Sequence, residues 1–293
     1  MRKGIKRRLS LYRIVVAELV DIYKSNRFAM VGLIGITVLV FTALFAQYIS
    51  PYDISQRSEE ILRPPSYNHI LGTDDVGKDI LSLIIHGSRA SLLIGLAATT
   101  IAVLIGTAVG MLSGYFGGIK GEILMRVTDM FLVLPALPFM IVLAAILQPN
   151  IWNVIIAIGV TSWTHTARIT RSLVLSLRER AYILRAKAIG CSDVRIIYKY
   201  IVPQIIPIVL ACGVVIAANA IASEAILSFI GLGDIRVVSW GTILYFAFQS
   251  GAFTRGAWWY FLPPGICITA TVLMFILVGQ GFDEIINPKL RKV

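Results

Sequence analysis

The sequence predicts an all-α membrane protein with six transmembrane helices, and three observations support this. Apolar residues make up 57% of the 293 residues and charged residues only 15%, whereas a soluble domain carries roughly a quarter charged residues. The charged residues leave five long runs free of Asp, Glu, Lys and Arg. Lys and Arg outnumber Asp and Glu by 27 to 16. A soluble domain, a disordered chain and a disulfide-rich secreted protein are therefore excluded.

The charge-free runs locate the helices. They cover residues 28–52, 90–119, 130–167, 200–223 and 256–282. One helix needs about 20 apolar residues to cross a bilayer, so the 38-residue run from 130 to 167 is long enough for two. Gln148-Pro149-Asn150 lies inside it, and we expect a tight turn there. The predicted spans lie near residues 28–49, 91–113, 128–147, 151–173, 204–226 and 259–281.

The basic residues predict the orientation. Eight fall within residues 1–27, eight within 168–199, and five more at 120, 126 and the C-terminus. With the N-terminus inside, 21 of the 27 are cytoplasmic, as the positive-inside rule requires. Both termini are therefore predicted to be cytoplasmic, in a multi-pass protein of the cytoplasmic membrane. The basic excess then reflects topology and membrane lipid, with no nucleic acid as a partner.

Four regions are predicted from these spans. Residues 1–27 form a cytoplasmic amphipathic segment on the membrane surface, or alternatively a frayed basic tail. Residues 28–88 hold the first transmembrane helix and an extracytoplasmic segment, in which 79–87 is a short helix capped by Asp79. Residues 89–282 form a core of five transmembrane helices with a cytoplasmic loop at 175–203. Residues 283–293 form a cytoplasmic tail.

One motif in the outer segment imitates a nucleotide-binding loop. The stretch from Gly72 to Asp79 nearly matches G-x-x-x-x-G-K-S/T. Asp79 replaces the hydroxyl that would hold Mg²⁺, and Asp74 and Asp75 would bring negative charge to the phosphate. We therefore predict no nucleotide site here. The three histidines show no metal-ligand spacing, and we predict no metal site and no catalytic residue.

Several residues at membrane depth break the apolar pattern. Gly106, Gly110, Gly114 and Gly118 recur every four residues and predict a groove for close helix packing. The prolines predict breaks in the third and sixth helices that face protein or a water-filled path. These prolines are Pro135, Pro138, Pro263 and Pro264.

Two acids also lie at membrane depth. Glu224 lies deep in an apolar stretch beside Ser223 and near Asn219. Its carboxylate is costly to bury, so these residues either line a translocation pathway or form structural hydrogen bonds. Asp129 is expected to pair with Arg126 or to reach the interface.

The cytoplasmic loop between the fourth and fifth spans predicts a helix–turn–helix. A helix is expected over 179–189, ended by Gly190. Ser192 or Asp193 would cap a second helix, and Pro203 lies near the start of the fifth span. Such a unit projects rigidly from the membrane; its alternative interpretation is an ordinary basic loop that anchors topology.

This loop resembles that of inner-membrane permease subunits of ABC importers for dipeptides, oligopeptides and nickel. Those permeases carry E-A-A-x-x-x-G, then nine residues, then I-x-L-P. Here Ala186, Gly190 and Pro203 match this motif at the same spacing. Leu184 stands in the position of the glutamate and Arg185 in that of the first alanine. Other matching stretches are Leu71–Asp74, Gly114–Gly118, Arg171–Arg180, Glu224–Gly233, Ser239–Gly241 and Asn287–Arg291. The long outer segment matches the permease of the pair that is usually lettered C.

The resemblance implies the type I ABC importer permease fold and a mechanism. This chain would form half of a translocation pathway for peptides, with a second, homologous permease as the other half. Two cytoplasmic ATPase subunits would hold ATP and Mg²⁺, none being bound by this chain, and an extracytoplasmic solute-binding protein would deliver the substrate. The residues implied in contact with the ATPase are Tyr182, Leu184, Arg185, Ala186, Gly190 and Asp193.

Other functions stay open on the sequence alone. The same family is associated with nickel and oligosaccharides. A secondary carrier would need intramembrane coupling groups, for which Glu224 is the sole candidate. A membrane-embedded enzyme or a structural anchor is the alternative outside transport.

Overall fold

The computed structural model describes residues 26–286, and within them every regular element is a helix. These are α2 (Arg27–Leu44), α3 (Ala46–Ile49), α4 (Ile80–Phe116), α5 (Gly118–Val133), α6 (Ala136–Leu147), α7 (Ile151–Thr161), α8 (Thr164–Arg178), α9 (Ala181–Ala188), α10 (Asp193–Ile196), a π-helical turn (Ile197–Ile201), α11 (Val202–Phe229), α12 (Trp240–Gln249) and α13 (Trp258–Ile286). The predicted all-α class is confirmed for these residues. The amphipathic segment predicted at 1–27 lies outside them, apart from its last two residues, as does most of the tail predicted at 283–293.

Within residues 26–286, four helices are long and apolar enough to cross a membrane: Arg27–Leu44, Ile80–Phe116, Asp193–Phe229 and Trp258–Gly281. The pair α5 and α6 makes a fifth if it is counted as one broken span, although its halves are bent by 92°. The break that the prolines predict in the third span is confirmed at Pro135, between α5 and α6. The span predicted at 151–173 is also divided, into α7 and α8, and no break was predicted there. The second helix also begins at Ile80, well before the predicted residue 91, so 79–87 is its first part rather than a separate short helix.

The break between α5 and α6 has a local cause. Pro135 is the N-cap of α6, and Leu134 before it is extended, since a proline disfavours helical backbone in the preceding residue. The break between α7 and α8 has no proline. The hydroxyl of Thr161 donates there to the carbonyls of Ala157 and Ile158 at 2.9 and 3.0 Å, but Thr99 and Thr128 make the same kind of bond inside unbroken helices.

The prolines of the last span do not break it. α13 continues through Pro263 and Pro264, so the break predicted there was wrong. The carbonyls that lose amide partners to these prolines belong to Trp259 and Tyr260 in the first turn. The tight turn predicted at 148–150 is confirmed, with Gln148 in left-handed backbone and the side chain of Asn150 accepting from the amide of Trp152 at 2.9 Å.

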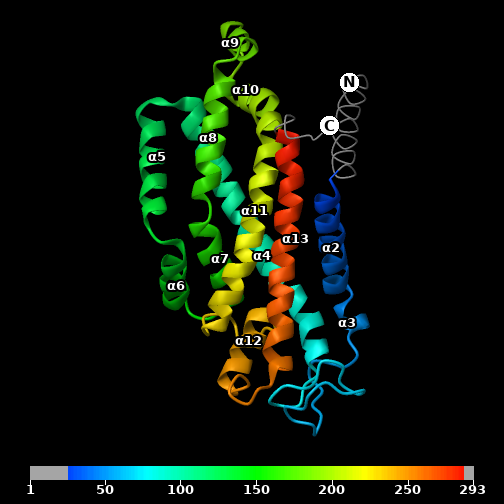
Figure 1. Ribbon diagram of the computed structural model, residues 1–293. Coiled ribbons are helices and arrows are strands. Elements are labelled where there is room, and N and C mark those ends of the chain that lie inside the picture. Colours follow the sequence, from blue (N-terminus) through cyan, green and yellow to red (C-terminus); the bar gives the residue numbers. More distant parts are fainter. Residues whose placement is uncertain (1–25, 287–293) are drawn as a thin grey trace.

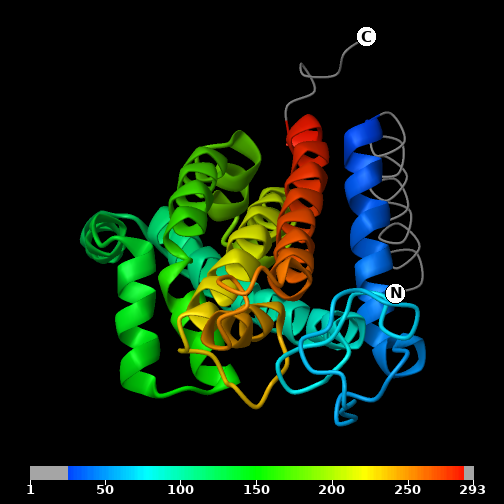
Figure 2. The ribbon, with the colours of Figure 1, turned by 60° about the horizontal axis from the view of Figure 1, so that its bottom comes forward.

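The helices form a bundle with two distinct ends. α4, α11 and α13 lie together, α2 flanks them on one side, and α5 and α6 stand on the other (Figures 1 and 2). The unit α9–α10 projects at one end of the bundle, while α12 and the segment 50–79 lie at the opposite end (Figure 1). The helix–turn–helix and the long outer segment are thus on opposite ends, as expected from the charge pattern.

α4 and α8 pack closely along an extended interface. A Cβ atom on Gly106 would lie 2.5 Å from the carbonyl oxygen of Trp163, and one on Gly114 would lie 2.9 Å from Cβ of Val174. Gly110 faces Ala167 equally closely. The predicted glycine groove is confirmed for these three residues. Gly118 is not part of it, because nothing lies within 4 Å of its Cβ position.

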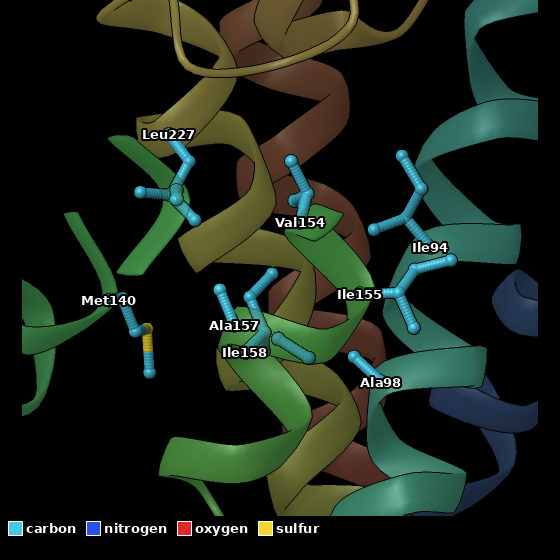
Figure 3. Close-up of a cluster of buried hydrophobic side chains, with 10 residues drawn as sticks. Ile94, Ala98, Met140, Val154, Ile155, Ala157, Ile158 and Leu227 are labelled. Atoms are coloured by element: carbon cyan, nitrogen blue, oxygen red, sulfur yellow. The ribbon is translucent and has the colours of Figure 1, made fainter. Parts of the chain in front are cut away.

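A buried apolar cluster fixes α7 between α4, α6 and α11. Val154, Ile155 and Ile158 of α7 pack against Ile94 of α4 and Leu227 of α11 (Figure 3). Each of these side chains is buried, and between helices in a bilayer such contacts stabilise through close van der Waals packing. α7 is therefore held by protein on several sides, although it is too short to span a membrane alone.

The segment 50–79 is an ordered loop whose polar groups bond to each other. Asp79 caps α4 as predicted, accepting from the amide of Ser82 at 2.8 Å, and also contacts His69 Nδ1 at 3.0 Å. The carboxylate of Asp74 accepts from the amides of Val76 and Lys78 at 2.9 and 2.7 Å. Burial raises the pKa of Asp74 above its ordinary value. The amides that a phosphate would need are thus occupied by this chain's own carboxylate.

Candidate functional site

The helix–turn–helix has the local structure that its sequence specifies. α9 ends at Ala188 with Ile189 as its C-cap, and Gly190 follows with a φ of +79°. The amide of Cys191 donates to the carbonyl of Ala186 at 3.0 Å, and that of Gly190 to Lys187 at 2.9 Å. This pair of bonds is a Schellman motif, which needs a left-handed residue in the position of Gly190. Ser192 is the N-cap of α10.

The buried face of this unit fixes it to the bundle. Ile183 and Ala186 are buried, with 0% and 4% of their surface exposed, and they pack with Val174, Leu177 and Ile196. Ala186 therefore contacts the protein's own core. A larger side chain there would displace α9 from α8.

Two polar contacts reach from the end of α4 to this unit. The hydroxyl of Tyr115 donates to Asp193 at 2.5 Å, and the ammonium of Lys187 lies 4.8 Å from the centre of the Tyr115 ring. Arg178 donates to the carbonyls of Gly114 and Tyr115 at 3.4 and 3.3 Å, where α4 ends. Asp193, implied as a contact with another subunit, is thus bonded within this chain.

The outward face of the unit is apolar with a basic rim. Leu184 has 48% of its surface exposed, Ile189 81% and Val194 65%. Tyr182 is 38% exposed, and its hydroxyl accepts from Gln204 at 2.7 Å. Arg185 is also exposed. A projecting apolar face of this kind indicates a protein partner.

A cavity of about 1080 Å³ lies at the bend between α5 and α6. Its walls come from that bend, from the α7–α8 junction and from α11. The backbone break at Pro135 therefore faces this space, as expected for irregular backbone at membrane depth. The residues of the walls are mainly apolar, and the polar ones are Thr161, Ser162, Thr164, His165, Thr166, Asn219 and Ser223.

The three residues predicted for the pathway divide into two groups. Asn219 and Ser223 line the cavity. Glu224 does not; it is fully buried, and accepts from Ser228 at 2.8 Å and from Ser91 at 3.3 Å. The amide of Trp240, the first residue of α12, donates to the same Ser91 hydroxyl at 3.1 Å. Glu224 thus links α4, α11 and the start of α12.

Two features of this region were missed in the sequence. His165 lines the cavity from the first turn of α8, within the polar run Thr161–Thr166 that interrupts an apolar stretch. That interruption was the available signal. Asp129 of α5 pairs with Arg168 of α8 at 2.6 Å, a partner that neither of the two alternatives for Asp129, pairing with Arg126 or reaching the interface, had named. The two residues are 39 positions apart, beyond the reach of a helical-spacing argument.

Two family models match the chain. The model described as "Binding-protein-dependent transport system inner membrane component" matches residues 106–292, and "N-terminal TM domain of oligopeptide transport permease C" matches residues 18–65. The first model includes both the cavity and the helix–turn–helix.

Similar proteins match over nearly the full length. The oligopeptide transport system permease protein OppC of Bacillus subtilis is 38% identical, covering 98% of this chain and 92% of that protein. The dipeptide transport system permease protein DppC of Escherichia coli is 36% identical, covering 92% of both chains. The di/tripeptide permease protein DppC of Pseudomonas aeruginosa is 34% identical, covering 92% of this chain and 90% of that protein.

A solved structure matches the fold. A chain of the MetNI methionine ABC transporter in an inward facing conformation superposes with a TM-score of 0.55 and 16% identity, covering 72% of this chain and 98% of that chain. With the family models and the apolar helices, these matches identify a multi-pass protein of the inner membrane. The chain belongs to the family of inner-membrane components of binding-protein-dependent transport systems.

Proposed function

We propose that this chain is a permease subunit of an ATP-driven ABC importer that carries di- and oligopeptides across the cytoplasmic membrane. The observation that carries this proposal is the near full-length similarity to three permeases named for such substrates. The cavity is the corresponding structural element, since it has the size of a small-ligand site. It would form half of the pathway, with a second, homologous permease providing the rest.

The proposed topology has six crossings with both termini in the cytoplasm. Counting α5–α6 and α7–α8 as one broken crossing each gives six with the four long helices. The helix–turn–helix then lies in the cytoplasm and the segment 50–79 outside. Single cysteines at Ile189 and Tyr67, both exposed, in a background lacking the native cysteines test this. A membrane-impermeant thiol reagent added to intact cells should label only the cysteine at position 67.

The apolar outward face of α9 and α10 is the proposed contact with one of two cytoplasmic ATPase subunits, which hold ATP and Mg²⁺. Leu184, where related permeases have glutamate, supplies an apolar contact. Closure of the ATPase pair would move this rigid unit and alternate the access of the cavity. Leu184→Asp should reduce ATPase binding in a pull-down, while Ile183, buried behind it, keeps the unit folded.

Uptake assays test the substrate. Cells or proteoliposomes with the permease pair, the ATPases and the solute-binding protein should take up a radiolabelled tripeptide when ATP is present. Deletion of this chain should abolish that uptake. Uptake of nickel or an oligosaccharide with no peptide uptake would contradict the peptide assignment while keeping the permease assignment. Uptake driven by a proton gradient without the ATPases would contradict both.

A further inference from the structure

We propose that His165 binds the C-terminal carboxylate of the peptide during its passage through the cavity, an inference that rests on the proposed function. A peptide carries a carboxylate, and a bare carboxylate is costly to move into a mainly apolar space. The cavity must therefore offer it a donor. The side chains that line the space decide which donor is available.

Among the described residues that line the cavity, His165 alone can carry a positive charge. Its side chain is exposed to the space. The nearest arginine along α8, Arg168, is already paired with Asp129 at 2.6 Å. An imidazole donates a hydrogen bond in both its neutral and its charged form, so His165 can serve the carboxylate in either state.

The neighbours of His165 favour an anion. Thr164, His165 and Thr166 form the first turn of α8, and all three line the cavity. The N-cap, Trp163, makes no side-chain hydrogen bond to this turn, and the start of a helix attracts negative charge. Thr166 is fully buried, and a Cβ atom on Gly106 of α4 would lie 2.7 Å from its Cβ. Its side chain therefore packs towards α4, and the side-chain donor that this turn presents to the cavity is the imidazole of His165.

A histidine also suits transport better than an arginine would. A site on a pathway must bind strongly enough to admit the substrate and weakly enough to release it. Arginine binds a carboxylate through two parallel hydrogen bonds, whereas an imidazole presents one nitrogen at a time to it. Asn219 and Ser223 on α11 line the same cavity and can bond to the peptide backbone without adding charge.

The test compares one peptide with a free C-terminus and the same peptide with a C-terminal amide. Both are assayed with the complete importer in proteoliposomes, containing His165→Leu or the native residue. Leucine has no hydrogen-bond donor in its side chain, so we expect His165→Leu to lower uptake of the free-carboxylate peptide about tenfold, the effect of one hydrogen bond to a charged group, and to leave uptake of the amide unchanged. The ratio of the two rates removes the preference of the solute-binding protein. His86→Leu, outside the cavity, is the matched control and should leave both rates unchanged.

A second measurement omits the binding protein. A photoreactive peptide is cross-linked to the permease complex in lipid nanodiscs, and the two peptides compete for labelling. The free-carboxylate peptide should compete better with the native protein and equally with His165→Leu. His165→Arg should bind the free-carboxylate peptide more tightly and transport it more slowly.

The outcomes separate the two proposals. Equal loss of both peptides with His165→Leu, or equal competition by both in the native protein, would overturn the role of His165 and leave the peptide importer standing. Absence of any peptide uptake by the native importer would overturn the proposed function, and this inference with it.

Discussion

The hydroxyl of Tyr115, the next-to-last residue of α4, donates a 2.5 Å hydrogen bond to Asp193, the first residue of α10. The two residues are 78 positions apart, and only 3% of the surface of Tyr115 is exposed. This bond connects the longest helix of the bundle directly to the unit that we propose to contact the ATPase. Any displacement of that unit therefore acts on α4, which also forms the close contact with α8.

Tyr115→Phe should weaken the coupling of ATP hydrolysis to transport. The variant removes one hydrogen bond and keeps the ring that packs beside Lys187, so we expect a loss of about 1 kcal/mol of stability and a several-fold fall in uptake per ATP hydrolysed. The measurement is uptake and ATP hydrolysis in the same proteoliposomes. Tyr48→Phe, at a side chain with 84% of its surface exposed, is the control. An unchanged ratio in Tyr115→Phe would contradict the coupling role of this bond.

Gly190 should be replaceable only by residues that accept left-handed backbone. Its φ is +79°, and nothing lies within 4 Å of its Cβ position. The backbone conformation, and not the space for a side chain, therefore limits which residues can replace it. Gly190→Asn should retain most transport, because asparagine adopts this conformation readily. Gly190→Ala should cost about 1 to 2 kcal/mol, and Gly190→Pro should abolish transport while the protein is still expressed. Equal uptake by the Asn and Pro variants would show that the Schellman turn is not needed.

Ala186 and Ala188 lie in the same turn of α9 with opposite exposure. Ala186 is buried in the cluster that joins α9 to α8, and Ala188 is exposed. Ala186→Leu should destabilise the unit by about 1 to 3 kcal/mol through overpacking and abolish transport, whereas Ala188→Leu should leave the melting temperature unchanged. Melting curves of both purified variants check this. Loss of transport with an unchanged melting temperature in Ala186→Leu would instead assign Ala186 to the partner contact.

Local features of the fold were predictable from the sequence because short-range chemistry determines them. The cap at Asp79, the turn at Gln148–Asn150 and the glycine turn at 190 each depend on residues within a few positions. The α4–α8 groove was predictable from glycine spacing alone, except at Gly118, where α5 has already begun.

The features that the sequence did not predict involve contacts between residues far apart in the chain, or helix breaks that no simple sequence rule marks. Asp129 forms an ion pair with Arg168 on another helix, and Tyr115 donates a hydrogen bond to Asp193. Sequence spacing contains no information on either pair. The break after Thr161 lies at a stretch without proline, so the rule that located the break at Pro135 could not find it. In the site, Asn219 and Ser223 line the cavity, while Glu224, one residue further along α11, is turned into the helix bundle.

Neighbouring substitutions at Ser223 and Glu224 should separate transport from stability. Glu224→Ala leaves the hydroxyls of Ser91 and Ser228 without their acceptor and opens a void among α4, α11 and α12. An unsatisfied buried donor costs about 1 to 3 kcal/mol, so the melting temperature should fall clearly. Glu224→Gln keeps an acceptor oxygen and the side-chain volume, so it should retain most stability and near-native uptake.

Ser223→Ala removes a hydroxyl that lines the cavity, and the smaller side chain introduces no strain. Its stability should change by less than about 0.5 kcal/mol, while uptake of peptides changes. Melting curves and uptake rates of Glu224→Ala, Glu224→Gln and Ser223→Ala together distinguish an effect on stability from an effect on transport. If Glu224→Gln lost uptake at an unchanged melting temperature, the carboxylate would have to act on the substrate or on an ion, and its assignment as a link between helices would be wrong. The hydrogen bonds to Ser91 and Ser228 on two different helices favour the structural result, because a carboxylate held by both cannot reach the cavity without breaking them.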